Sequence, residues 1–115
     1  MTHRNTHKAM ERRIAKALGG RRIPLSGSLI LMPGDVITDK FLVECKLRAS
    51  SGKKQIAIEK DWLTKIEKEA KSQNKIPLLI FKYKNDKAYY VILNLKDFLK
   101  IKEVDDVAHR KHSFK

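Results

Sequence analysis

Two acidic residues and a lysine stand at a spacing that suits chemistry on phosphate esters. Asp35 opens a short apolar run, and Glu44 and Lys46 stand close together within the segment Phe41–Arg48. If the two segments form a hairpin through a turn at residues 38–40, Asp35 lies beside Glu44. Two carboxylates are ligands that a hard cation such as Mg²⁺ prefers, and a nearby lysine can orient or activate a water molecule. The spacing therefore indicates a metal-dependent hydrolytic site.

The segment Phe41–Arg48 alternates in polarity, which predicts a β-strand because successive strand residues face opposite sides. One face is apolar and the other mostly charged: Phe41, Val43, Cys45 and Leu47 against Leu42, Glu44, Lys46 and Arg48. Cys45 is therefore interpreted as a small core residue and not as a nucleophile. Edge strands also carry Glu and Lys for solubility alone. The full spacing, Asp-x8-Glu-x-Lys after Pro33-Gly34, is more restrictive than Glu-x-Lys by itself.

This spacing resembles the motif of the PD-(D/E)XK nuclease superfamily, in which a metal-binding Asp is followed by Asp or Glu, any residue, and Lys on a neighbouring strand. Within that superfamily the chain is similar to the small Holliday junction resolvases of archaea and their phage-borne relatives, over residues 8–95. The resemblance rests on order and spacing. It implies a single α/β domain with a mixed central β-sheet flanked by helices, in a restriction-endonuclease-like αβββαβ core.

The resemblance also implies roles for the residues of the motif. Asp35, Glu44 and the backbone carbonyl of Cys45 would bind Mg²⁺, for which Mn²⁺ can substitute. Glu11, on the predicted first helix, would help to bind this ion or a second one. Lys46 would orient the attacking water for in-line displacement at phosphorus.

The first helix is predicted from Lys8 to Leu18, with an apolar stripe opposite a basic face. Glu11 lies at the border of the stripe and is the only acid in this segment. Two interpretations stay open, a surface glutamate paired with a neighbouring arginine and the metal-site glutamate that the resemblance implies. For His3 and His7 a disordered arm is favoured over a metal site, because no cysteine or further histidine lies nearby.

Gly19-Gly20 is expected to end this helix as a C-cap, and a flexible basic loop follows. The resemblance matches Ser28 in this loop to a catalytic-site serine of the family, with Ser26 as the alternative. Contacts to the DNA backbone are predicted for the basic side chains of the helix, of this loop and of the turn after the central strand. They are Arg12, Arg13, Lys16, Arg21, Arg22, Arg48, Lys53 and Lys54.

The composition favours a polyanionic partner. The chain has 115 residues, with 26 Lys and Arg against 13 acidic residues, so its net charge is +13. Nucleic acid is the commonest partner for such a charge. The length predicts one domain, residues 1–115, and the single cysteine excludes an internal disulfide. No apolar run is long enough to span a bilayer, and a cytoplasmic location, cellular or phage-encoded, is expected.

The remaining pattern predicts an α/β order of helix, three strands, helix and two strands. The expected elements are a short apolar run at Leu29–Met32, a third strand at Gln55–Glu59, a helix at Lys60–Asn74 with Trp62 in its buried stripe, strands at Pro77–Phe81 and Lys87–Leu93, and a helical turn or short helix at Leu95–Lys100. Residues 1–7 and 102–115 are expected to be flexible tails. The hairpin that carries the motif should lie near the middle of the sheet.

The function predicted from these observations is a Mg²⁺-dependent endodeoxyribonuclease that resolves four-way DNA junctions as a homodimer. Two two-fold related sites would suit a two-fold junction. One alternative is another PD-(D/E)XK nuclease that nicks or cuts ordinary duplex. The other is a basic DNA-binding module without catalysis, in which Asp35, Glu44 and Lys46 decorate the surface.

Overall fold

The computed structural model describes residues 6–23, 35–48 and 55–113 of the 115, and side chains within these ranges except those of Arg48 and residues 109–113. Its elements, in chain order, are α1 (His7–Leu18), β1 (Arg21–Arg22), β2 (Val36–Ile37), β3 (Phe41–Arg48), α2 (Lys60–Ser72), β4 (Ile76–Tyr83), β5 (Tyr90–Ile92) and α3 (Leu95–Ser113). The expected run at Leu29–Met32 lies outside the described residues.

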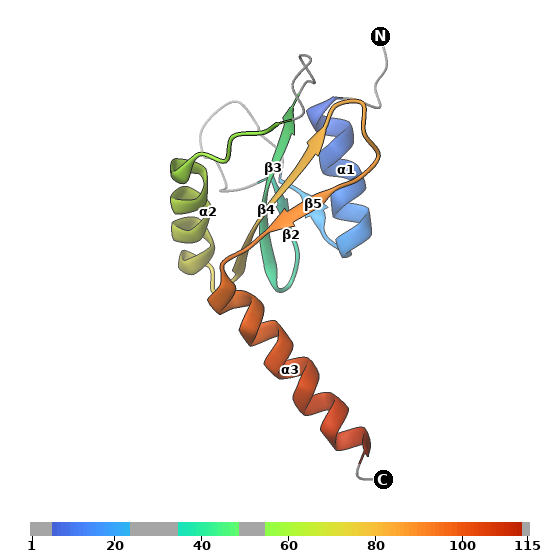
Figure 1. Cartoon of the computed structure of the whole chain (residues 1–115), viewed down its shortest axis with the longest axis vertical. Helices are drawn as coiled ribbons and strands as arrows, with labels where there is room; N and C mark the ends of the chain where they lie inside the picture. Colours follow the sequence, from blue (N-terminus) through green and yellow to red (C-terminus); the bar gives the residue numbers. More distant parts are fainter. Residues whose placement is uncertain (1–5, 24–34, 49–54, 114–115) are drawn as a thin grey trace.

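The strands form one mixed sheet in the order β1-β2-β3-β4-β5 (Figure 1). β3 and β4 are parallel, and the other neighbouring pairs are antiparallel. The β2–β3 hairpin occupies the second and third positions, so the prediction that it lies near the middle of the sheet is confirmed. The predicted α/β class, a mixed sheet flanked by helices, is also confirmed.

Helices α1 and α2 cover opposite faces of this sheet, because β3 presents alternate side chains to each. Val43 and Cys45 pack with Met10 and Ile14 of α1, and each of these four side chains is at least 96% buried. On the other face, Leu42 packs with Ile66 and Ala70 of α2. Burial of Cys45 confirms that it is a core residue, and the low polarity around it raises the pKa of its thiol.

Capping interactions fix where α1 begins and ends. The Thr6 hydroxyl accepts a hydrogen bond from the Ala9 N–H at 3.0 Å, which begins the helix one residue earlier than the sequence predicts. At the other end Gly19 has φ 70°, a left-handed conformation that glycine adopts without strain, and this C-cap was predicted. Gly20 contacts the Ile37 carbonyl so closely that a Cβ atom there would clash with it.

The predicted strand at Gln55–Glu59 is wrong. These residues form no strand, and the third strand before α2 is instead β1, Arg21–Arg22. The reason is that a strand can join the sheet only along the unpaired edge of another strand. Both edges of β3 are taken by β2 and β4, whereas the outer edge of β2 is free to pair with β1. Two residues are too few for β1 to show a periodic pattern in the sequence.

Helix α3 continues to Ser113, beyond the helical turn or short helix expected at residues 95–100, and extends away from the sheet (Figure 1). Asn94 begins it by accepting a hydrogen bond from the Lys96 N–H at 2.8 Å. Lys102 pairs with Asp106 one turn later at 2.9 Å, an interaction that favours a helix over the loose tail expected there. Within the described chain, no helix combines the length and apolarity that crossing a membrane requires.

Candidate active site

Asp35 lies where the β2–β3 hairpin opens. Its N–H donates to the Val43 carbonyl at 2.7 Å, and the next residue forms the register pair Val36–Val43. The register pairs begin at Val36, so Asp35 precedes the paired residues, and its charge is close enough to Glu44 to raise the pKa of that carboxyl. The Asp35 carboxylate accepts a hydrogen bond from the Cys45 N–H at 2.8 Å. This bond holds the carboxylate against the middle of β3.

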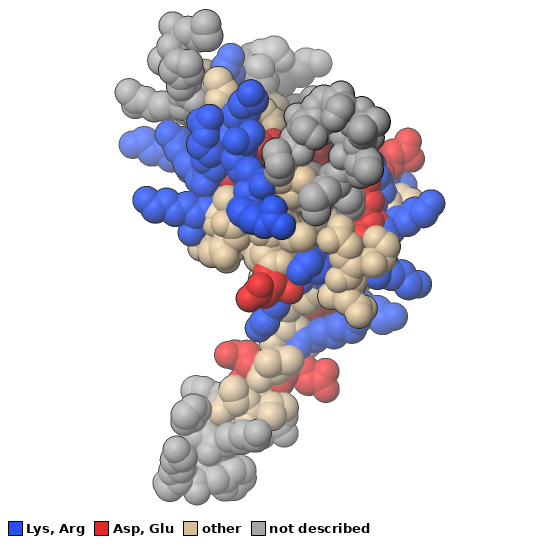
Figure 2. All heavy atoms as spheres, turned by 180° about the vertical axis from the view of Figure 1, so that it is seen from behind, with Lys and Arg blue, Asp and Glu red and all other residues tan. Residues whose placement is uncertain are grey.

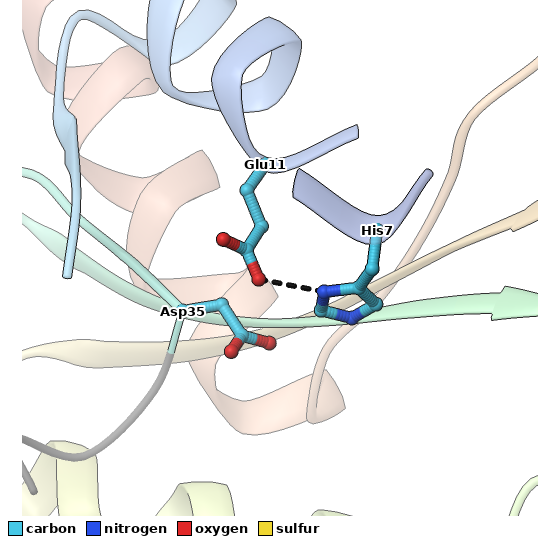
Figure 3. Close-up of side chains that lie close together, drawn as sticks. All are labelled: His7, Glu11 and Asp35. Carbon is cyan, nitrogen blue, oxygen red and sulfur yellow. Dashed lines mark ion pairs between the residues drawn. The ribbon is translucent and has the colours of Figure 1, made fainter. Parts of the chain in front are cut away.

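Three side chains from two elements converge at this point (Figure 3). His7, Glu11 and Asp35 each offer one ligand atom, and these atoms lie within 4.8 Å of one another. His7 and Glu11 are one helical turn apart on α1, so they face β3 together. Two carboxylates and an imidazole form a donor set that divalent cations such as Mg²⁺ and Mn²⁺ accept, although nitrogen suits Mn²⁺ better.

His7 is a candidate ligand that the sequence interpretation missed, because that interpretation favoured a disordered arm. Its Nδ1 lies 2.6 Å from Glu11 Oε2, and its Nε2 lies 2.8 Å from the Cys45 carbonyl oxygen. Both neighbours are hydrogen-bond acceptors, so a ring nitrogen of His7 that carries a proton can donate to either one, and a nitrogen without a proton is the one that could bind a metal ion. The spacing of four residues between His7 and Glu11, one turn of a helix, is the signal in the sequence that could have identified this pair.

Glu11 combines features of both interpretations that the sequence left open. Its side chain is buried, and Arg22 donates from Nε to Glu11 Oε1 at 3.0 Å. Pairing with a nearby arginine is therefore observed, but inside the cluster and not on the helix surface. Arg22 is predicted from the sequence to contact DNA. In the structure it is half-buried on β1 and its guanidinium neutralises Glu11.

Glu44 and Lys46 lie next to this cluster, on the side of the sheet that α2 covers. Lys46 Nζ is 3.5 Å from Glu44 Oε2 and 4.4 Å from the centroid of the Trp62 ring. Among the described side chains, Glu44 does not join the three-residue group of potential ligands. Trp62 is half-buried and lies against Lys46, so it is more than the core residue that its helical spacing predicts.

The two strand carboxylates are held in surroundings that disfavour negative charge. Burial raises the pKa of Asp35 above its usual 3.8; the Cys45 N–H opposes this, and the charge of Glu11 adds to it. Burial also raises the pKa of Glu44 above its usual 4.5, and the neighbouring charge of Asp35 adds to the increase. A cation bound here would stabilise both ionised carboxylates.

The predicted DNA-contacting residues fall into three groups. Arg12, Arg13 and Lys16 are exposed on α1, and Arg21 is exposed on β1. Figure 2 shows basic side chains gathered on the side of the domain where α1 lies, whereas α3 carries both signs of charge. Lys53, Lys54 and the side chain of Arg48 lie outside the described residues, and so do Ser28 and Ser26, the two candidates for a catalytic-site serine.

The fold and the motif together define a class. A mixed sheet with a helix on each face, an Asp at the start of one strand and Glu-x-Lys on its neighbour is the arrangement of PD-(D/E)XK nucleases. Over residues 3–115 the chain matches the model of a family described as "Phage putative PDDEXK endonuclease". The chain belongs to this family of phage PD-(D/E)XK endonucleases. Comparisons with curated proteins and with solved structures gave no match.

Proposed function

We propose that this endonuclease hydrolyses phosphodiester bonds of DNA in a Mg²⁺-dependent reaction centred on Asp35. The observation that carries the proposal is the position of Asp35 between two functional groups. Its carboxylate is within 4.8 Å of the ligand atoms of Glu11 and His7, and its charge raises the pKa of the nearby Glu44. Asp35 thus joins a potential metal site to the Glu-x-Lys pair of β3.

The residues present fit a divalent cation. Asp35 and Glu11 supply carboxylates, His7 supplies a nitrogen, and the Cys45 carbonyl lies within reach because His7 already contacts it. A change of side-chain rotamer would bring Glu44, the residue before Cys45 on β3, into the coordination shell of this cation. A divalent cation bound there would neutralise phosphate charge and lower the pKa of water.

Lys46 is proposed to orient the attacking water. Its ammonium is kept near the carboxylates by Glu44 and by the Trp62 ring, which fixes a long side chain that would otherwise sample many rotamers. As a donor of three hydrogen bonds it can hold water or a phosphate oxygen. The exposed arginines of α1 would hold the DNA backbone without reading its sequence.

We further propose four-way junctions as the preferred substrate and a homodimer as the active form, on the strength of the resemblance to small junction resolvases. Exposed apolar side chains outside the DNA-facing side support a second copy as the partner. They are Tyr90 of β5 and Leu95, Phe98 and Leu99 of α3. Residues 95–108 hold three lysines and four acids, so this surface escapes the charge repulsion expected between chains of net charge +13.

One experiment tests both parts of the proposal. Wild-type protein is incubated with a labelled mobile four-way junction or a matched linear duplex, with and without Mg²⁺, and the products are resolved on a gel. Cleavage of the junction only with Mg²⁺, together with dimer mass in light scattering, is expected. Equal cleavage of the duplex would leave a nuclease without junction preference. Absence of cleavage on either DNA would contradict the nuclease proposal and favour a binding module.

A further inference from the structure

A cluster of basic side chains, separate from the cluster of His7, Glu11 and Asp35, lies between α1 and the β4–β5 turn. It lines a pocket of about 440 Å³ bordered by Arg13, Lys82, Lys84, Asn85, Asp86, Lys87 and Tyr89. Four of these seven residues are cationic and one is acidic. Among the described residues, no ion pair involves the four cations. The pocket therefore concentrates positive charge that the protein itself leaves unneutralised.

Lys82 makes this pocket different from a solvated basic surface. Its side chain is only 4% exposed, and its Nζ donates to the carbonyls of Tyr83 and Lys84 at 3.1 and 3.0 Å. An ammonium has three N–H donors, so one remains for a ligand. Burial of a lysine away from a carboxylate is costly unless an anion approaches it.

Tyr89 supplies a second indication of a ligand. Its hydroxyl oxygen is buried but has no hydrogen-bond partner among the described residues. Buried polar groups are almost always paired, and a hydroxyl without a protein partner commonly awaits water or a ligand. A phosphate oxygen is a strong acceptor and would pair with both the Tyr89 hydroxyl and the remaining N–H of Lys82.

The pocket is close to the candidate active site and on the same face of the sheet. Cys45 pairs with Ile80, and Lys82 follows two residues later on β4, so both side chains face α1. One strand spacing across and two residues along give a Cα separation of about 8 Å between Cys45 and Lys82. DNA presents a phosphate every ~3.4 Å of axis on each strand, so a backbone passing Asp35 can also reach this pocket.

We propose that this pocket binds a phosphodiester of the DNA backbone a few nucleotides from the scissile bond. Lys82 and Tyr89 hold its oxygens, and Arg13, Lys84 and Lys87 close around it. The inference rests on the proposed function, because it fixes how the DNA crosses the α1 side of the sheet. It assigns to β4 and to the β4–β5 turn a role in positioning the substrate.

The test measures binding separately from cleavage. Fluorescence anisotropy of a labelled junction and a labelled duplex is followed in EDTA at several salt concentrations. The variant Lys84→Gln/Lys87→Gln is compared with Lys100→Gln/Lys102→Gln on α3, whose lysines already face Asp97 and Asp106. Both doubles remove two charges, so total charge is matched. The double variant in the pocket should make the fall of log affinity with log salt less steep by about 0.9, the value for one phosphate. The double variant in α3 should leave this slope unchanged.

Tyr89→Phe tests the pocket without changing charge. It should weaken DNA binding by about two- to tenfold, the effect of one hydrogen bond, while thermal unfolding stays the same or shifts upward. Unchanged affinity in Tyr89→Phe and equal losses in the two lysine doubles would overturn the phosphate site. Cleavage by wild type in Mg²⁺ is scored independently. If wild type cleaves DNA but the pocket variants bind DNA as wild type does, only this inference is refuted. If the pocket variants lose affinity but wild type does not cleave, only the nuclease proposal is refuted.

Discussion

The ammonium of Lys46 lies 4.4 Å from the centroid of the Trp62 ring, so a residue of α2 braces the lysine of the Glu-x-Lys motif. A cation over an aromatic face is stabilised by about 0.5–1 kcal/mol at a partly exposed position. Because Glu44 holds the same ammonium at 3.5 Å, the strand and the helix fix its position jointly.

Trp62→Leu should therefore slow cleavage by about fivefold, which corresponds to about 1 kcal/mol, without weakening DNA binding. Trp62→Phe keeps an aromatic face and should recover most of the rate. Single-turnover rates at saturating enzyme measure the effect, and thermal unfolding of both variants shows whether folding is disturbed. Equal rates for Leu and Phe would indicate that the ring does not position Lys46.

Lys46→Met should remove cleavage while leaving metal binding intact. The thioether chain fills similar space against Trp62 but supplies no N–H to hold water. Titration calorimetry with Mn²⁺ should give an affinity equal to or above that of wild type, because a cation beside the site has been removed. A variant that loses Mn²⁺ binding would show that Lys46 has a structural role in the metal site.

The raised pKa values of Asp35 and Glu44 predict a pH-dependent stability of the metal-free protein. A carboxyl whose folded-state pKa lies above its unfolded value favours the folded protein below that unfolded value, near 3.8 and 4.5 respectively, and loses this contribution as pH rises through the folded pKa. At pH 7 both carboxylates therefore destabilise the fold. Asp35→Asn and Glu44→Gln should each raise the melting temperature by a few degrees in EDTA at pH 7.

Well below pH 3.8 the same variants should melt at the wild-type temperature, because the carboxyls are then protonated in both states. Mg²⁺ at pH 7 should stabilise wild type and have little effect on Asp35→Asn, since a ligand that binds only the folded state raises its stability. Calorimetric scans across pH measure both effects. A loss of stability in both variants at pH 7 would show that these carboxylates support the fold.

His7→Ala should weaken Mn²⁺ binding by about tenfold, in the range found when one group of a metal site is removed. The control is Lys8→Ala, the exposed neighbour in the first turn of α1, which should bind Mn²⁺ normally. The contrast between them separates loss of a ligand from damage to the helix start. Stronger binding by His7→Ala would mean that the imidazole competes with the metal for Glu11 and Cys45.

Local pattern predicted the hairpin well because its signals are contained within it. Alternation along Phe41–Arg48 is enough to separate two faces, and the short distance to Asp35 leaves one register. His7 could not be placed in this way, since its contact with the Cys45 carbonyl depends on how α1 crosses β3. That crossing is set by Met10 and Ile14 packing on the sheet, a tertiary effect that no single segment encodes.

The strand predictions show a related limit. Gln55–Glu59 alternates like a strand, but a strand also needs a free edge, and β3 has none left. Arg21–Arg22 lacks any pattern, yet it pairs with β2 and brings Arg22 to Glu11. Which strand edges are paired, and which arginine contacts Glu11, depend on the assembled sheet and are seen only in the structure.

The most direct test of the account is Mg²⁺-dependent DNA cleavage by wild type and by Asp35→Asn. Asparagine keeps the oxygen that accepts the Cys45 N–H and removes only the charge. With a labelled four-way junction in single-turnover conditions, wild type should cut only when Mg²⁺ is present. Asp35→Asn should be slower by about a thousandfold or more, while it binds the junction in EDTA as tightly as wild type or more tightly. Cleavage by Asp35→Asn within a factor of a few of wild type would contradict the assignment of this site.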